Sequence, residues 1–198
     1  MFQLALRHAI GGLGLLAAVL GGVGPTRAGA VDPVFADGFE VRPIVVPAGT
    51  WSFVGFDNAL CGNGSSTGIG VNPGPPGGRL LLFLSGGGAC WDNTTCIVLQ
   101  TASNFNSGYG PANFNGDLGQ LGSGFFDRNA PGNPFRNDSF VFVPYCTGDV
   151  HAGDNVVTYG GNVRHHAGYR NMGAFLERLV PTFSGASRVV LAGASAGG

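Results

Sequence analysis

A serine within a Gly-x-Ser-x-Gly pattern is the residue of this chain best suited to covalent chemistry. Ser195 lies between Gly193 and Gly197, directly after the apolar run Arg188–Ala192. Where such a pattern turns from a strand into a helix, the serine takes a strained conformation and its hydroxyl stands clear of the sheet. A serine placed in this way can attack an ester or amide carbonyl. We therefore interpret Ser195 as a nucleophile; the alternative is an ordinary turn in a chain with 37 glycines.

Acyl transfer by a serine also requires donors for the oxyanion of the intermediate. Three consecutive glycines begin directly after the apolar run Arg79–Ser85, where hydrolases of this kind place one such donor. Their N–H groups can face a substrate with no Cβ atom in the way. The backbone N–H after the nucleophile supplies the second donor. The predicted oxyanion hole consists of Gly86, Gly87 and Ala196.

Four further residues are candidates for the substrate pocket. Gly88 and Ala89 continue the glycine-rich loop, and Asp149 and His151 lie with Asp154 in a polar loop after another apolar run. Capping of that loop is the alternative role of the acidic side chains. No pair of cysteines has the spacing common in zinc sites, and the chemistry requires no cofactor. We expect neither a metal nor an organic cofactor.

The general base is not evident among the four histidines, which all precede Ser195. They are His8, His151, His165 and His166. Hydrolases of this type carry their triad in the order Ser, then Asp or Glu, then His. His165 or His166 could act as the base, since triads are recognised by geometry, but a polar first turn of the following helix is the ordinary explanation. We expect the acid and the base beyond Gly198, and this chain alone to be inactive.

Three apolar runs predict buried strands that bring these residues to one edge of a sheet. They are Arg79–Ser85, Ser139–Tyr145 and Arg188–Ala192. Between the last two, apolar residues recur at helical spacing, and Pro181 is expected to end the helix. These positions are Tyr169, Met172, Leu176, Leu179 and Val180. A strand, helix and strand in this order imply a right-handed crossover, so the predicted fold class is α/β with a mostly parallel sheet.

Three other segments have weaker patterns. Thr50–Phe56 alternates weakly and could be a strand. The glycine-rich stretch Gly62–Gly78 is predicted to be a loop. Asn104–Pro134 has no periodicity, so we expect either an ordered surface excursion or a lid.

The first 30 residues are typical of a cleavable secretory signal peptide. A basic start at Arg7 and His8 precedes the apolar run Ala9–Gly24, and Ala28–Ala30 fits a cleavage site. The alternative is a membrane anchor, but the apolar run is shorter than the roughly 20 residues that a spanning helix needs. We expect a secreted or periplasmic protein, cut near Ala30, without a stable membrane anchor.

Composition indicates one domain after this leader. The 198 residues are 44% hydrophobic and 11% charged, with a formal net charge of -1, so attraction to nucleic acid is not expected. We assign residues 31–43 to an N-terminal lead-in and residues 44–198 to the domain. Export favours disulfides. The four cysteines allow three pairings, among which sequence does not choose; we favour Cys61 with Cys146 and Cys90 with Cys96.

Five sequence blocks together form a specific combination. They are CGNGSS from Cys61, FLSGGGACWD from Phe83, PYCTGDVHAGD from Pro144, HHAGY from His165 and GASAGG from Gly193. This combination resembles the pectin acetylesterase family from Cys61 to the end of the chain. The resemblance implies an α/β-hydrolase fold that is incomplete here, with C-terminal strands and helices missing. It also supports both favoured disulfides.

For function, the resemblance implies a secreted serine esterase that deacetylates a polysaccharide through an acyl-enzyme on Ser195. It carries the oxyanion hole onto Gly86, Gly87 and Ala196. Ala89 stands where plant and animal members usually have an aromatic residue, so the chain looks like a bacterial branch. Together, Ala89 and the neighbouring glycines predict a tight pocket that prefers acetyl esters. The alternatives are a lipase or peptidase on the same fold, and a non-catalytic secreted binding protein with a lost triad.

Overall fold

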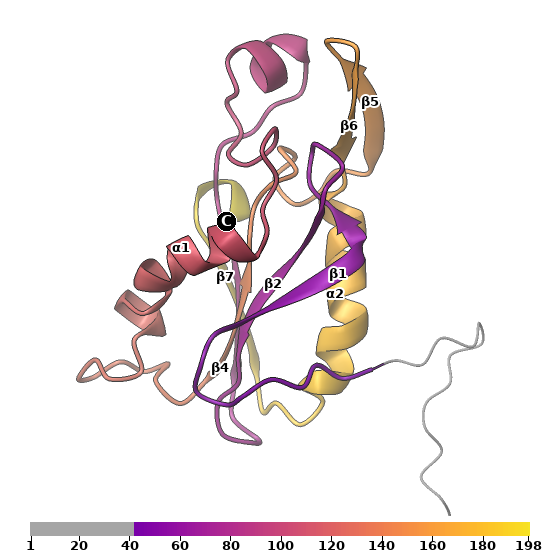
Figure 1. Cartoon of the computed structure of the whole chain (residues 1–198). Helices are drawn as coiled ribbons and strands as arrows, with labels where there is room; N and C mark the ends of the chain where they lie inside the picture. The colour runs from indigo at the N-terminus through magenta and orange to yellow at the C-terminus, as the bar shows by residue number, and fades with distance from the viewer. Residues whose placement is uncertain (1–41) are drawn as a thin grey trace, which may run out of the picture. The chain divides into compact units, whose positions relative to one another are not determined.

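A five-stranded sheet is the centre of the structure, a computed structural model that describes residues 42–198 (Figure 1). The predicted signal peptide and most of the lead-in at residues 31–43 lie outside the described residues. The strand order is β1-β2-β4-β3-β7. The strands are β1 (Ser52–Leu60), β2 (Ser66–Asn72), β3 (Leu80–Leu84), β4 (Ser139–Val143) and β7 (Val189–Gly193).

The sheet is mixed, so the prediction of a mostly parallel sheet holds for only part of it. Strand β3 pairs in parallel with both β4 and β7. Strands β1 and β2, and β2 and β4, pair antiparallel. The three strands predicted from apolar runs are those of the parallel part, because parallel strands are buried on both faces and leave continuous apolar sequence.

Strand β2 corrects the prediction that Gly62–Gly78 is a loop. Its glycines allow close packing. A Cβ atom on Gly68 would lie only 2.0 Å from the carbonyl oxygen of Val54 on the neighbouring strand β1. Glycine in a strand can thus mark a close approach of two backbones.

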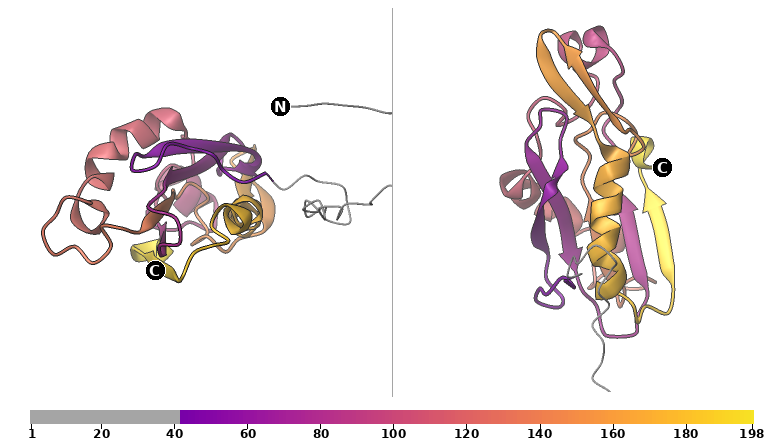
Figure 2. Two further views of the ribbon diagram at one scale, coloured as in Figure 1. Left: turned by 90° about the horizontal axis from the view of Figure 1, so that it is seen from below. Right: turned by 90° about the vertical axis from the view of Figure 1, so that its right-hand side faces the viewer.

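Helices α1 (Pro111–Leu121) and α2 (Gly168–Thr182) lie on opposite sides of the sheet (Figures 1 and 2). On the α2 side, Phe175 and Leu179 pack with Phe56, Val71 and Leu82. The α1 side buries mainly aromatic and sulfur-containing side chains. They are Cys61, Leu81, Tyr109, Phe114, Leu121, Phe126, Phe140, Phe142 and Cys146. The two cores make a three-layer α/β/α arrangement.

The predicted helix is corrected in two details. Helix α2 continues through Pro181 to Thr182. Three residues of the predicted apolar face, Tyr169, Leu176 and Val180, are exposed, whereas the buried Phe175 lies off that pattern. Asn104–Pro134 was expected to be an ordered surface excursion or a lid, and it contains α1 and the 3₁₀ turn η2 (Gly124–Phe126). It is an ordered excursion that packs on the sheet.

A two-stranded hairpin was not predicted. Strands β5 (Asn155–Tyr159) and β6 (Asn162–His166) pair antiparallel through a turn at Gly160 and Gly161, both with positive φ. His165 and His166 therefore lie on a strand and not at the start of a helix. The hairpin stands beside a single π-helical turn, η1 (Thr94–Val98) (Figure 1).

Two disulfides join loops near the carboxyl ends of the parallel strands. The pairs are Cys61–Cys146 and Cys90–Cys96, as favoured from the sequence. Within residues 42–198, no helix has both the length and the apolar character needed to cross a membrane.

Candidate active site

Ser195 is the first residue of a 3₁₀ turn, η3 (Ser195–Gly197), that directly follows β7. Its φ angle is +49°, in the left-handed region that residues with a Cβ atom rarely adopt. Such strain in a polar residue at the end of a strand is typical of functional sites. Because the residue is also exposed, its hydroxyl is accessible to a substrate.

The flanking glycines of the motif are required by close contacts. A Cβ atom on Gly193 would lie 1.9 Å from the carbonyl oxygen of Gly197. One on Gly197 would lie 2.2 Å from the carbonyl oxygen of Leu84, on the neighbouring strand β3. The turn can therefore form only with glycine on both sides of Ser195, which is the physical basis of the pattern.

The parallel pairing of β3 and β7 brings the glycine loop to the serine. Leu84 is in register with Gly193, so both strands end side by side. A Cβ atom on Gly86 would lie 2.3 Å from the carbonyl oxygen of Ala194 and 2.9 Å from Ser195 Cβ. The amide N–H groups of Gly86 and Gly87 have no acceptor within residues 42–198. They are thus available to bind an oxyanion next to Ser195.

The glycine loop is held by the segment that follows it. The Ser103 amide donates to the carbonyl oxygen of Gly87 at 2.7 Å, and Gly88 forms an antiparallel bridge with Ala102. Thr101 Oγ1 donates to the carbonyl oxygen of Ala89 at 2.5 Å. These bonds fix the loop without using the amides of the predicted oxyanion hole.

A cavity of about 540 Å³ opens at Ser195. It brings together three of the predicted site residues, Gly86, Gly87 and Ser195. The other lining residues are Phe83, Ser85, Asp117, Gln120, Leu121, Ser123, Gly124, Phe125, Phe126, Phe142 and Ala194. The other predicted site and pocket residues, Gly88, Ala89, Ala196, Asp149 and His151, are not among the lining residues.

Aromatic rings form much of the cavity wall. Phe83 contacts Phe125, Phe126 and Phe142, with ring centroids 5.3, 5.5 and 6.3 Å apart. Sequence reasoning did not assign Phe125 and Phe126 to the site, because they follow α1, far from the motifs. The adjacent phenylalanines in a polar segment were the only available signal.

The α1 wall also carries a carboxylate. Tyr109 donates to Asp117 Oδ2 at 2.7 Å. Burial, with the hydrogen bond and the charge of Asp117, raises the pKa of Tyr109 far above its ordinary value. The tyrosine stays protonated, so it can keep donating to the carboxylate. This pair places a carboxylate at the cavity wall.

The polar loop after β4 has a structural role. Asp149 accepts from Thr147 Oγ1 at 2.6 Å and from the Gly168 amide at 2.7 Å, which places its charge at the N-terminus of α2. Asp154 pairs with Arg170. Both carboxylates therefore have partners outside the cavity.

The histidine rings are also engaged elsewhere. His151 Nε2 donates to the carbonyl oxygen of Ser85 at 2.8 Å, next to the glycine loop. His166 Nδ1 donates to the carbonyl oxygen of Thr147 at 3.0 Å, and its ring stacks on Phe105. No hydrogen bond joins Ser195 to a histidine among residues 42–198, and no group of three His, Cys, Asp or Glu in that part of the chain could hold a metal ion.

Known proteins share sequence similarity with most of this chain. The family model described as Pectinacetylesterase matches residues 52–198. Palmitoleoyl-protein carboxylesterase notum2 of Xenopus laevis is 32% identical over 153 residues, which are 70% of this chain and 28% of the relative. Human palmitoleoyl-protein carboxylesterase NOTUM is 29% identical over 150 residues, which are 71% and 28%. The chain thus spans little more than a quarter of the length of these curated relatives.

Proposed function

Because the chain belongs to the pectinacetylesterase family, we propose that it carries the nucleophile and the oxyanion hole of a serine carboxylic ester hydrolase. The observation that carries this proposal is the strained, exposed Ser195, packed against Gly86 at the mouth of a cavity. In this reading Ser195 is the catalytic residue, and Gly86, Gly87 and Ala196 stabilise the oxyanion.

The proposed reaction has two steps. In the first, Ser195 Oγ attacks the ester carbonyl, its proton passes through the general base to the leaving alcohol, and an acyl-enzyme forms. Water then attacks the acyl carbon and releases the acid, and Ser195 regains its proton. In both steps the amides of the glycine loop bind the negative oxygen of the tetrahedral intermediate.

The general base is proposed to be a histidine outside residues 42–198. The rings of His151 and His166 already bond to backbone carbonyls. His165 lies on the hairpin strand β6 and contacts Gly64, where a Cβ atom would lie 3.3 Å from its Nε2. This assignment agrees with the order Ser, then Asp or Glu, then His that α/β-hydrolases have.

An acylated polysaccharide is the proposed substrate, with its acyl group against the aromatic wall. The cavity wall favours a second candidate, an ester of a larger acyl group, because its four phenylalanines offer more apolar surface than an acetyl group can cover. Ala89, from which a tight pocket was predicted, is not among the lining residues.

The test is hydrolysis of aryl acetate, butyrate and octanoate by the full-length protein. The proposal predicts that Ser195→Ala lowers kcat by at least about 10³-fold, since the hydroxyl is the attacking group. Ser187→Ala, at an exposed serine before β7, is the matched control and should keep full activity. Fastest turnover of acetate selects the deacetylase, and fastest turnover of octanoate selects the second candidate. Inactivity of the wild type on every ester would refute the proposal and favour a non-catalytic binding protein.

A further inference from the structure

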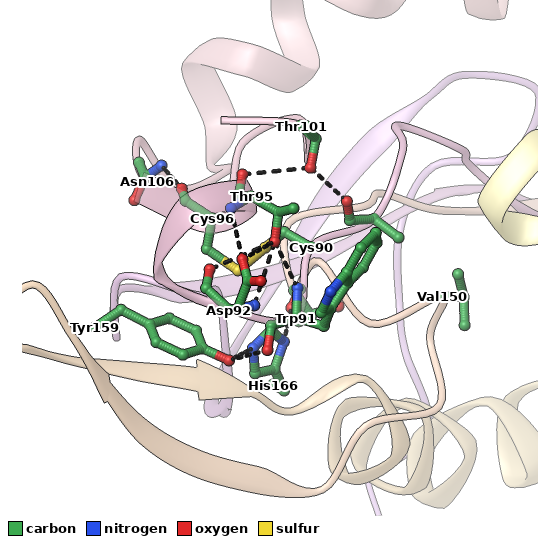
Figure 3. The surroundings of a disulfide bond; sticks show 12 residues. Cys90, Trp91, Asp92, Thr95, Cys96, Thr101, Asn106, Val150, Tyr159 and His166 are labelled. Carbon is green, nitrogen blue, oxygen red and sulfur yellow. Dashed lines mark hydrogen bonds between the residues drawn. A yellow bond between two sulfur atoms is a disulfide. The ribbon is translucent and has the colours of Figure 1, made fainter. Parts of the chain in front are cut away.

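Trp91 is the most exposed aromatic side chain near the glycine loop. It is 70% exposed, although tryptophan is highly buried on average. It lies beside the disulfide Cys90–Cys96, and its indole points away from the sulfur atoms (Figure 3). Packing in a hydrophobic core therefore does not explain why a tryptophan stands at this position.

The backbone around Trp91 is held from several sides. Its amide donates to Thr95 Oγ1 at 3.0 Å, and its carbonyl oxygen accepts from the Tyr159 hydroxyl at 2.8 Å (Figure 3). The Cys90 amide donates to the carbonyl oxygen of Gly148 at 2.9 Å. An exposed side chain on a fixed backbone loses little conformational freedom when a ligand binds.

Trp91 is also close to the proposed site of reaction. It follows Gly87, which lines the cavity, by four residues, so the two Cα atoms are at most about 14 Å apart. A polymer that presents one ester to Ser195 could reach Trp91 with neighbouring units. A small ester could not make this contact.

The groups around the indole favour an uncharged ligand that forms hydrogen bonds. The exposed residues that follow Trp91 in this segment are the polar Asp92, Asn93, Thr94, Gln100 and Thr101 and the apolar Val98 and Leu99. Residues 86–110 contain one carboxylate, Asp92, and no lysine or arginine. Hydrogen bonds from Thr95 lower the pKa of Asp92, so it is charged at neutral pH. From residues 86–110, a polyanion or an anionic membrane would meet the carboxylate of Asp92 and no lysine or arginine.

We propose that Trp91 is a stacking platform for an uncharged acylated polysaccharide, which it holds across the glycine loop while an ester is presented to Ser195. The C–H faces of sugar rings pack on an indole, and their hydroxyls remain free to bond to the polar rim. Tryptophan suits such a contact because it is rigid and offers a large apolar face. The proposal deepens the function proposed above and rests on it.

Two measurements on the full-length protein test the platform. The first is the ratio of kcat/KM on acetylated xylan to kcat/KM on aryl acetate. Trp91→Ala should lower this ratio about tenfold, mainly through KM on the polymer, since truncation of a contact tryptophan typically costs at least the free energy of a tenfold change. Trp91→Phe should restore most of the ratio. Leu99→Ala, which removes another exposed apolar side chain of the same segment, is the control and should leave it unchanged.

The second measurement is direct binding, which does not require turnover. In the Ser195→Ala background, affinity electrophoresis should show retardation by acetylated xylan that Trp91→Ala abolishes, and weaker retardation by acetylated polygalacturonate. Equal loss with Leu99→Ala, no retardation by xylan, or stronger retardation by the anionic polymer would each overturn the platform. Retardation without esterase activity in the wild type would keep the platform and refute only the proposed reaction.

Discussion

The contact between Gly86 and the serine turn allows a quantitative prediction. In Gly86→Ala the new methyl carbon would lie 2.3 Å from the carbonyl oxygen of Ala194 and 2.9 Å from Ser195 Cβ. Optimal contacts between carbon atoms begin at about 3.5 Å, so the loop and the turn must separate by about 1 Å. A displacement of that size at reacting groups can cost about 10²-fold in rate. We expect kcat/KM to fall about 100-fold, with about 1–3 kcal/mol of lost stability from overpacking.

The assay is hydrolysis of the best aryl ester by the full-length protein, with thermal unfolding followed by circular dichroism. Gly173→Ala on α2 is the matched control, because a Cβ atom there meets nothing within 4 Å. This control should keep wild-type kcat/KM and gain up to about 1 kcal/mol of stability, since alanine is the better helix former. Wild-type kcat/KM in a folded Gly86→Ala protein would show that this contact does not position the nucleophile.

Two further predictions concern stability. Replacing Cys61 and Cys146 by alanine should cost about 4.5 kcal/mol of stability in the chain-entropy treatment, because this disulfide spans 85 residues. Replacing Cys90 and Cys96, which are 6 residues apart, should cost about 2 kcal/mol. Urea unfolding of both double variants tests this order of stability. Burial raises the pKa of Tyr145 from 10.0 to about 12, so its contribution to stability is complete below pH 10 and is lost as the pH rises to about 12. Tyr145→Phe should flatten this decline in urea unfolding, and an unchanged pH profile would contradict the assignment.

The parallel strands were predictable because burial on both faces leaves a local signal. Strand β3 lies within the run Arg79–Ser85, and β7 is displaced by one residue from Arg188–Ala192. The antiparallel strand β2 was missed because its glycines looked like loop residues. Gly68 allows the backbone of Val54 on β1 to approach closely, and the sequence around Gly68 does not reveal this contact. A glycine-rich strand and a glycine-rich loop look alike until the neighbour is known.

Other misses have similar causes. Helix α1 buries only Phe114 and Leu121 among its apolar positions, so its periodicity is weak. The hairpin carried a usable signal, the Gly160-Gly161 pair between two segments with β-branched residues, which is typical of a two-residue turn. It was obscured by interpreting His165 as part of the next helix.

At the site, the motifs predicted that Ser195, Gly86 and Gly87 lie together, because their geometry is local to two strand ends. The cavity wall was not predictable, because Phe125 and Phe126 reach it through the packing of α1 on the sheet. Asp149 illustrates the opposite case. It was a candidate for the pocket, yet it bonds to the first amide of α2, where a carboxylate is favoured by the unpaired N–H groups and the helix dipole.

The central claim, that Ser195 is the nucleophile, is tested most directly by covalent labelling of the full-length protein with a fluorophosphonate, followed by intact mass and peptide mapping. The account predicts one adduct, on Ser195, that is absent in Ser195→Ala and is reduced when an ester substrate competes. An adduct on another residue, or equal labelling of Ser195→Ala, would contradict it.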